Sequence, residues 1–389
     1  MAPMNTHLLI LPLLTASLSY AAPASPAALV QTDEGTQDLS AELEKIRAEA
    51  GAPGVVAVAV QDGTVVAWAV AGVRAQGSSA KLQLGDPMHL GSCTKAMTST
   101  LLACLIDEGK LRSDSTIGEV LPELAKRIDK SYHDVTVDML LHHRAGIAER
   151  RRPEVMAAYG ELDSIEGSAA EIRLELLARV MHLPQLPPAD GAFDYSNFGY
   201  MTAGAMAEAV TGKTWEALMA EKVFRPLGMT SAGLGSPAGD DVPVGHQMTD
   251  GVLVALPPGP DGELPVCMGP AGLAHSNLVD WARFVTDQMR GERGEGELLK
   301  SDTYVQLHAD TYGSGYAAGW GIAKHSLSWS EPTASWRHNG SDGTWYSMVK
   351  ALPEWELVVV SAANCADGPA ERATTQAELL LLKALGFAD

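Results

Sequence analysis

The sequence is poor in positive charge. Of its 389 residues, 28 are Lys or Arg and 48 are Asp or Glu, which gives a formal net charge of −20 at pH 7. The only basic run is the short one from Arg150 to Arg152. Because an acidic surface repels polyanions, we expect neither nucleic acid nor an anionic membrane surface as a partner. A small molecule or a short peptide is the substrate that this composition favours.

Cysteine is scarce as well. The four cysteines form no C-x-x-C pair and are too few for a disulfide framework. They are Cys93, Cys104, Cys267 and Cys365. We interpret them as buried thiols, and the sequence leaves open whether any two of them pair. The adjacent His142 and His143 belong to no H-E-x-x-H motif, so we expect no metal and no other cofactor.

Long hydrophobic runs are absent apart from one near the N-terminus. The apolar segment 8–18 leads into Ser19-Tyr20-Ala21-Ala22, which resembles the end of a signal peptide. We therefore expect a signal peptide at 1–22, a flexible linker at 23–38 and a secreted or periplasmic protein with no membrane span after processing. The residues before the apolar segment include no Lys or Arg, which leaves an uncleaved tail as the alternative.

The motifs of several enzyme classes are missing too. No Gly-x-Ser-x-Gly elbow occurs, which argues against an α/β-hydrolase. Neither a phosphate-binding P-loop nor a dinucleotide fingerprint is present.

The chain does contain enough apolar residues for a large core, because they make up 46% of the sequence. Two strand-like runs around an Asp-Gly pair predict a hairpin, and their apolarity indicates that both faces are covered. Strands are predicted at 54–60, 64–70, 319–324, 334–338, 344–352 and 357–363. Helices are predicted at 39–51, after residue 92, within 162–181, and at 201–210, 214–224, 271–291 and 369–385, with loop at 239–265.

This order of elements predicts one domain over 39–389. We expect an antiparallel sheet built from both chain ends, about 39–91 and 300–389, and flanked by helices. A mostly helical part, about 92–299, is inserted between them.

The stretch around Ser92 carries the strongest chemical signal. Apolar residues at Met97, Leu101 and Leu105 predict an amphipathic helix behind Ser92. On such a helix Ser92 and Lys95 share a face, because side chains three positions apart are neighbours. A serine hydroxyl is a weak nucleophile alone, and an amine whose pKa is lowered by burial can take its proton.

A simpler explanation is that Ser92 only caps the helix, the commonest role of serine at such a position. Two other Ser-x-x-Lys matches occur, at 78–81 in a turn-like stretch and at 347–350 in a predicted strand, where the two side chains face opposite sides. Cys93, beside Ser92, has no base pattern of its own. Among these matches only Ser92 and Lys95 are placed to touch.

Two later fragments complete the pattern. Tyr195-Ser196-Asn197 is the only Tyr-x-Asn in the chain, and His338-Asn339-Gly340 lies at the end of a predicted strand. Alone, each has a structural explanation, as an aromatic loop anchor, a helix cap or a histidine on a strand surface. Gly340 would also let an extended substrate approach the strand, because no Cβ stands in the way.

With these motifs the sequence resembles the class C β-lactamase-like serine hydrolases, which include DD-peptidases, D-amino-acid-specific peptidases and β-lactamase-like carboxylesterases. The motifs Ser-x-x-Lys, Tyr-x-Asn and Lys/His-x-Gly of that family occur here in the same order. The likeness extends from about Leu39 to the C-terminus. It implies a β-lactamase/transpeptidase-like fold of the α/β (α+β) class.

The resemblance also implies roles for individual residues. The implied catalytic residues are Ser92 as the acylated nucleophile, Lys95 as its base and Tyr195 as shared base and later acid. The implied substrate-binding residues are Asn197, His338, Gly340 and Ser341. The backbone amides of Ser92 and Ser341 would form the oxyanion hole.

The implied function is a secreted serine hydrolase that cleaves an ester or amide bond through an acyl-enzyme. His338 stands where β-lactamases of this class usually carry Lys, and a mostly neutral imidazole holds a substrate carboxylate less well. The alternatives are a penicillin-interactive D-Ala-D-Ala carboxypeptidase or weak β-lactamase, and a catalytically inactive binding module of the same fold. The natural substrate and the oligomeric state are left open.

Overall fold

The computed structural model describes most of the chain: residues 35–147, 149, 152–186, 193–239, 241–256 and 264–388. The signal peptide that the sequence predicts at 1–22 lies outside the described residues, as does most of the linker predicted at 23–38.

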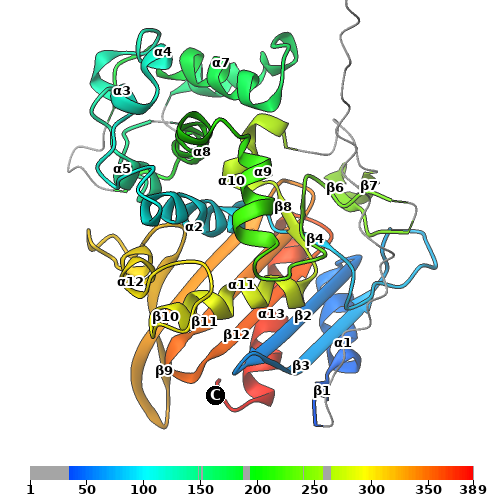
Figure 1. Ribbon diagram of the computed structural model, residues 1–389. Helices are drawn as coiled ribbons and strands as arrows, with labels where there is room; N and C mark the ends of the chain where they lie inside the picture. Colours follow the sequence, from blue (N-terminus) through cyan, green and yellow to red (C-terminus); the bar gives the residue numbers. More distant parts are fainter. Residues whose placement is uncertain are drawn as a thin grey trace, which may run out of the picture.

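The base of the molecule is a sheet that, within the described residues, has seven strands in the order β1-β3-β2-β12-β11-β10-β9 (Figure 1). The strands are β1 Gln37–Asp38, β2 Gly54–Gln61, β3 Thr64–Gly72, β9 Gly321–Leu327, β10 Ser330–Ser341, β11 Tyr346–Leu352 and β12 Leu357–Ala363. Neighbouring strands are antiparallel except β1 and β3. Because β2 pairs directly with β12, the sheet is built from both ends of the chain, as predicted.

The hairpin predicted around the Asp-Gly pair is formed by β2 and β3. Asp62 and Gly63 both have positive φ, 51° and 77°. This is the backbone that a two-residue hairpin turn requires, and Asp and Gly adopt it at little cost.

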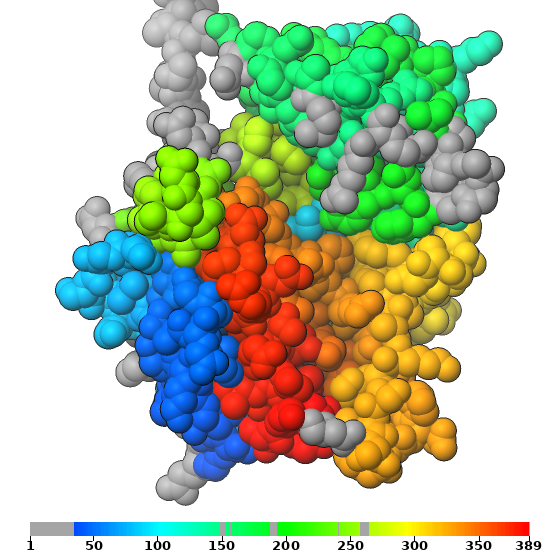
Figure 2. Space-filling model, turned by 180° about the vertical axis from the view of Figure 1, so that it is seen from behind, coloured from blue at the N-terminus to red at the C-terminus, as the bar shows by residue number. Residues whose placement is uncertain are grey.

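Helices cover both faces of the sheet. Helices α1, Ser40–Ala50, and α13, Asp367–Ala384, lie side by side on one face, where Figure 2 shows them in blue and red. Helix α11, Leu278–Gly291, covers the other face (Figure 1). Separate apolar clusters fill the two interfaces, which explains why β2 and β12 are apolar on both sides.

Helix α2, Thr94–Asp107, lies where the sheet meets the helical part (Figure 1). The sequence predicts a helix with one apolar face, and this is wrong, because every residue from Thr94 to Leu105 is buried. Helices α8, α10 and α12 pack against α2, so even its threonines are enclosed. The helix that carries the Ser-x-x-Lys motif is therefore held on all sides.

The helical part contains more strand than the sequence predicts. Its helices are α3 Ile117–Val120, α4 Pro122–Ala125, α5 Val137–Leu141, α6 Pro153–Tyr159, α7 Ala169–Met181, α8 Asn197–Thr211, α9 Trp215–Met219, α10 Gly269–Gly272 and α12 Ser301–His308. Its strands are β4 Met88–His89, β5 Gly233–Leu234 and β8 Ala274–Ser276 in one small sheet, and β6 Gly245–Thr249 and β7 Val252–Leu256 in another.

Two predicted segments differ from the structure in the elements that they contain. The segment 239–265, predicted as loop, contains the β6–β7 hairpin, which turns at Asp250 and Gly251 with φ of 50° and 81°. The abundance of Gly, Pro and Asp on either side concealed this second Asp-Gly signal. The helix predicted from 271 begins only at Leu278, because Asn277 Oδ1 accepts a hydrogen bond from Asp280 N and caps it.

None of the helices in the described part of the chain has the length and apolar character needed to cross a membrane.

Candidate functional site

Ser92 lies in the 3-10 turn η1, Gly91–Cys93, which leads directly into α2. The turn is tied to its neighbours by hydroxyl groups: Ser347 Oγ on β11 donates to Leu90 O at 2.8 Å, and Thr94 Oγ1 donates to Gly91 O at 2.7 Å. No side chain makes a capping bond at the start of η1 or α2. The capping explanation for Ser92 therefore does not hold, and its hydroxyl is left for other contacts.

Lys95 is fully buried one turn further along. Its Nζ lies 3.2 Å from Ser92 Oγ, 2.8 Å from Asn197 Oδ1 and 2.8 Å from the carbonyl oxygen of Ala271. The last two oxygens can only accept hydrogen bonds, so they hold two of the amine hydrogens. The side chains of Ser92 and Lys95 thus meet, as their spacing predicts.

Tyr195 and Asn197 come to the same place from the start of α8. Lys95 Nζ lies 4.7 Å from the centroid of the Tyr195 ring. Ser196 is the N-cap of α8, with its Oγ accepting from Gly199 N at 3.3 Å. This cap explains why Tyr195 precedes the helix and Asn197 begins it. The structure therefore brings together Ser92, Lys95, Tyr195 and Asn197.

The end of β10 crosses the η1 turn at very short range. A Cβ at Gly340 would lie 2.1 Å from Leu90 O and 2.7 Å from Ser92 N, and a Cβ at Gly91 would lie 2.4 Å from Ser341 N. The backbone amides of Ser92 and Ser341 therefore both lie where β10 crosses the η1 turn. This contact gives Gly340 a structural reason that the sequence did not predict: its missing side chain makes room for the turn that carries Ser92.

His338 lies at the end of a chain of hydrogen bonds. Its Nδ1 is 2.7 Å from the carbonyl oxygen of Asn339, its Nε2 is 3.1 Å from the Tyr316 hydroxyl, and that hydroxyl is 3.3 Å from His143 Nε2. His143 Nδ1 accepts from Ser196 N at 3.1 Å.

The two ends of this chain, together with the lowered pKa values of both histidines, indicate where the ring protons lie. A carbonyl only accepts, so His338 Nδ1 carries hydrogen and its Nε2 accepts from Tyr316. His143 Nδ1 accepts, so its Nε2 carries hydrogen and donates to Tyr316. Both histidines are neutral in this arrangement, and both ring nitrogens of His338 are engaged within the protein.

Burial and the charge of Lys95 favour these neutral forms. They lower the pKa of His338 to about 4 and hold the pKa of His143 well below its ordinary value. Burial likewise raises the pKa of the Tyr316 hydroxyl well above its ordinary value, so it stays protonated. The ring of His143 lies 4.3 Å from that of Tyr195, between centroids, which connects the chain to the rest of the site.

Cys93 is buried and all four cysteines are free thiols. Burial raises the pKa of the Cys93 thiol to about 12, so it carries no thiolate near neutral pH. Cys93 is therefore a structural neighbour of Ser92 rather than a competing nucleophile.

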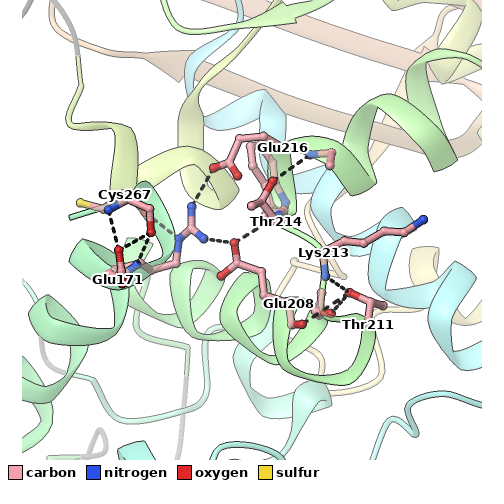
Figure 3. Close-up of polar contacts among 12 residues, drawn as sticks. Glu171, Glu208, Thr211, Lys213, Thr214, Glu216 and Cys267 are labelled. Carbon is pink, nitrogen blue, oxygen red and sulfur yellow. Dashed lines mark hydrogen bonds and ion pairs between the residues drawn. The ribbon is translucent and has the colours of Figure 1, made fainter. Parts of the chain in front are cut away.

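A buried ion cluster supports the segment that provides the Ala271 carbonyl. Arg173 on α7, fully buried, bonds Glu208 at 2.5 Å, Glu216 at 3.0 Å and the carbonyl oxygen of Cys267 at 2.9 Å. Figure 3 shows the side chains of Glu208 and Glu216 directed toward the same guanidinium group, with the backbone of Cys267 beside it. Cys267 lies in the 3-10 turn Val266–Met268, which leads into α10, so the cluster anchors the segment that contacts Lys95.

Three residues in or beside the site were not identified from the sequence. Glu149 contacts Asn197, and Tyr316 and His143 connect to His338. His143 was considered only as a metal ligand, and Glu149 and Tyr316 lie in segments without a regular pattern. Among the described residues no group of three or more His, Cys, Asp or Glu side chains is arranged to hold a metal ion.

Comparisons relate the chain to known proteins. A family model described as Beta-lactamase matches residues 39–383. Penicillin-binding protein 4 of Amycolatopsis lactamdurans is 26% identical over 334 residues, covering 83% of this chain and 83% of that protein. Unguisins hydrolase ungD' of Aspergillus campestris is 26% identical over 294 residues, covering 71% of this chain and 52% of the relative.

One solved structure extends the likeness to the fold. The octameric penicillin-binding protein homologue from Pyrococcus abyssi superposes with a TM-score of 0.72 at 22% identity, covering 90% of this chain and 77% of that one.

Proposed function

Because the chain belongs to the beta-lactamase family, we propose that it is a serine hydrolase that cleaves an ester or amide bond through a covalent acyl-serine intermediate. The observation that carries this proposal is the buried Lys95 amine, 3.2 Å from Ser92 Oγ and beside the ring of Tyr195. A nucleophile within reach of a base, with a further group next to the base, is the arrangement that acyl transfer needs.

In acylation, Ser92 Oγ attacks the substrate carbonyl carbon while its proton passes to Lys95 Nζ. The carbonyl oxygen becomes an oxyanion, which the backbone amides of Ser92 and Ser341 receive as hydrogen-bond donors. When the intermediate collapses, the bond to the leaving group breaks, and Lys95 and Tyr195 return a proton to that group. Water then attacks the acyl carbon along the reverse route and frees Ser92.

We propose a substrate without a carboxylate next to the cleaved bond, because His338 could not hold such a carboxylate. His338 is neutral, and both of its ring nitrogens are already bonded, to Asn339 and Tyr316. A neutral ring offers a carboxylate neither charge nor a free donor. We therefore place esters and amides before D-Ala-D-Ala peptides and β-lactams, although one relative is named for binding penicillin.

The experiment is a substrate panel with a matched pair of serine variants. Wild type is expected to turn over a p-nitrophenyl ester faster than a D-Ala-D-Ala peptide or a chromogenic cephalosporin, and a fluorophosphonate probe should label it. Ser92→Ala should abolish both, whereas Ser78→Ala, in the exposed Ser-x-x-Lys match, should change neither. Retained turnover in Ser92→Ala would refute the proposal. Failure of wild type to label while folded would favour a binding module.

A second variant tests the substrate class. In His338→Lys a cation replaces the neutral ring, so kcat/KM for the D-Ala-D-Ala peptide should rise relative to kcat/KM for the neutral ester. The measurement is the ratio of the two, which cancels any general loss of activity. An unchanged ratio would mean that residue 338 does not face the substrate.

We also propose that the protein is secreted or periplasmic, on the strength of the apolar segment 8–18 and the small residues that follow it. Sequencing the N-terminus of protein recovered from outside the cytoplasm should give Ala22 or Pro23 as the first residue. An intact Met1 on exported protein would contradict cleavage.

A further inference from the structure

The carboxylate of Glu149, 93% buried, lies against the first residues of α8. One oxygen, Oε2, accepts from Asn197 N at 2.6 Å and from Ser196 Oγ at 3.2 Å. These contacts are those of an anion at a helix N-terminus, which the helix dipole favours. They would be satisfied by a carboxylate that does nothing more than stabilise α8.

The other oxygen makes a different kind of contact. Oε1 accepts from Asn197 Nδ2 at 2.9 Å and from the Tyr159 hydroxyl at 3.1 Å. The two ends of an amide are told apart by their partners. Because a carboxylate only accepts, Glu149 requires the nitrogen of the Asn197 amide on its own side, which turns Asn197 Oδ1 toward Lys95.

The orientation of this amide decides what the lysine can do. With Oδ1 facing it at 2.8 Å, and Ala271 O at 2.8 Å, Lys95 in the deprotonated form needed to accept a proton would direct its two hydrogens at these acceptors. Its lone pair is then turned toward hydroxyl hydrogens, and Ser92 Oγ is 3.2 Å away. A reversed amide would instead present an N–H donor to Lys95 and compete for that lone pair.

We propose that Glu149 is a positioning residue: it fixes the Asn197 amide so that Lys95 can accept the Ser92 proton. The inference rests on the proposed acylation of Ser92. Glu149 itself touches neither Ser92 nor Lys95 in any described contact, and it acts through Asn197.

Glu149→Gln makes the inference testable. Its oxygen is expected to remain on Asn197 N and Ser196 Oγ, and its new NH2 group then meets the Asn197 side chain, whose amide must reverse. The rate of labelling by a fluorophosphonate should fall by about 100-fold, the lower range of what a general base contributes. Because a carboxylate near the ammonium has been removed, the acid limb of the pH profile should also move to lower pH.

A double variant distinguishes positioning from simple stabilisation of α8. In Glu149→Gln with Asn197→Asp, the glutamine NH2 donates to one aspartate oxygen and the other faces Lys95. Labelling should therefore be at least about 10-fold faster than in either single variant, and its acid limb should lie above that of wild type, because the carboxylate now contacts Lys95 directly. Asn197→Asp alone sets two carboxylates against each other and should be slow.

The controls separate the outcomes. Asp287→Asn converts another buried carboxylate, on α11, which accepts from the Tyr304 hydroxyl and from Glu297 N, and should label within about 3-fold of wild type. Near-ultraviolet circular dichroism reports folding of each variant. If Glu149→Gln does not fold, the labelling rate of the double variant compared with that of Asn197→Asp still tests whether Glu149 is a positioning residue.

The inference is overturned if Glu149→Gln labels at the wild-type rate, or if the double variant is no faster than Asn197→Asp. An unchanged pH profile in a slow Glu149→Gln would assign Glu149 to stability alone and would also overturn it. If wild type itself fails to label, the proposed function fails, and that result is distinct from these.

Discussion

At the scale of the residue, the site depends on which atoms are able only to donate or only to accept. The carbonyl oxygens of Asn339 and Ala271 and the carboxylate of Glu149 are acceptors without alternative. Each of them requires a hydrogen on the atom it contacts: Nδ1 of His338, Nζ of Lys95 and Nδ2 of Asn197.

Gly340 allows a prediction at this scale. In Gly340→Ala the new methyl group would meet Leu90 O at 2.1 Å and Ser92 N at 2.7 Å, so β10 and the η1 turn must separate. We expect labelling of Ser92 to fall by at least about 100-fold, the size of a lost oxyanion-hole donor, and unfolding free energy to fall by about 1–3 kcal/mol. Both are measured on the purified variant, by probe labelling and urea unfolding.

Gly251→Ala is the matched control. Gly251 has φ of +81° in the β6–β7 turn, and nothing lies within 4 Å of its would-be Cβ. The left-handed backbone costs an alanine about 1–2 kcal/mol, but the site is untouched. A loss of labelling as large in Gly251→Ala as in Gly340→Ala would show that the close approach at Gly340 is unimportant.

Part of the site was predictable because its signals are local. Ser92 and Lys95 are one helical turn apart, and Tyr195 and Asn197 flank a helix cap, so spacing alone relates the members of each pair. Glu149 reaches Asn197 across 48 positions and Tyr316 reaches His338 across 22, from segments without periodicity. Such contacts are decided by how the elements pack, which one sequence does not reveal.

At the scale of the element, α2 is positioned by its neighbours rather than by its own amphipathicity. Strands β10 and β11 hold the η1 turn that precedes it, and α10 holds Lys95 through the carbonyl of Ala271. The hairpins and most helices follow from turn residues and periodicity. The burial of every residue from Thr94 to Leu105 does not, because it depends on helices that come later in the chain.

The Arg173 cluster allows a prediction for α7 and its partners. Arg173→Met leaves Glu208 and the Cys267 carbonyl without their shared donor in a buried position. Breaking a buried ion pair in this way costs about 3–5 kcal/mol of unfolding free energy. Urea unfolding followed by tryptophan fluorescence measures the loss.

Arg179→Met on the same helix is the control. Arg179 bonds Glu161 and Glu175 near the surface, with 32% of its side chain exposed. Such pairs are worth at most about 1 kcal/mol. Equal losses in the two variants would mean that the Arg173 cluster is no more than a surface network.

At the scale of the whole molecule, several histidines are held neutral by the folded state. Burial lowers the pKa of His275 to about 4, and burial together with the charge of Lys95 lowers that of His338 to about 4. Their unfolded value is about 6.5. Between these two values the unfolded chain binds more protons than the folded one, so acid favours unfolding.

We therefore expect unfolding free energy to decrease as pH falls from about 6.5 toward 4, with a slope of about 1.4 kcal/mol per pH unit from each of these two histidines. Their stabilising effect is fully present above pH 6.5. Urea unfolding at pH 7, 6 and 5 measures the slope, and His275→Gln should remove one contribution. A slope that is zero, or that His275→Gln leaves unchanged, would contradict the assignment.

Because β10 and β11 hold the turn that contains Ser92, the site can form only after these two strands have been synthesised. During synthesis Ser92 and Lys95 are made long before β10 and β11, which follow more than 200 positions later in the chain. If the proposed acylation is right, we expect a C-terminally truncated chain to hold Ser92 and Lys95 without the strands that position them, and so to be inactive until synthesis is nearly complete.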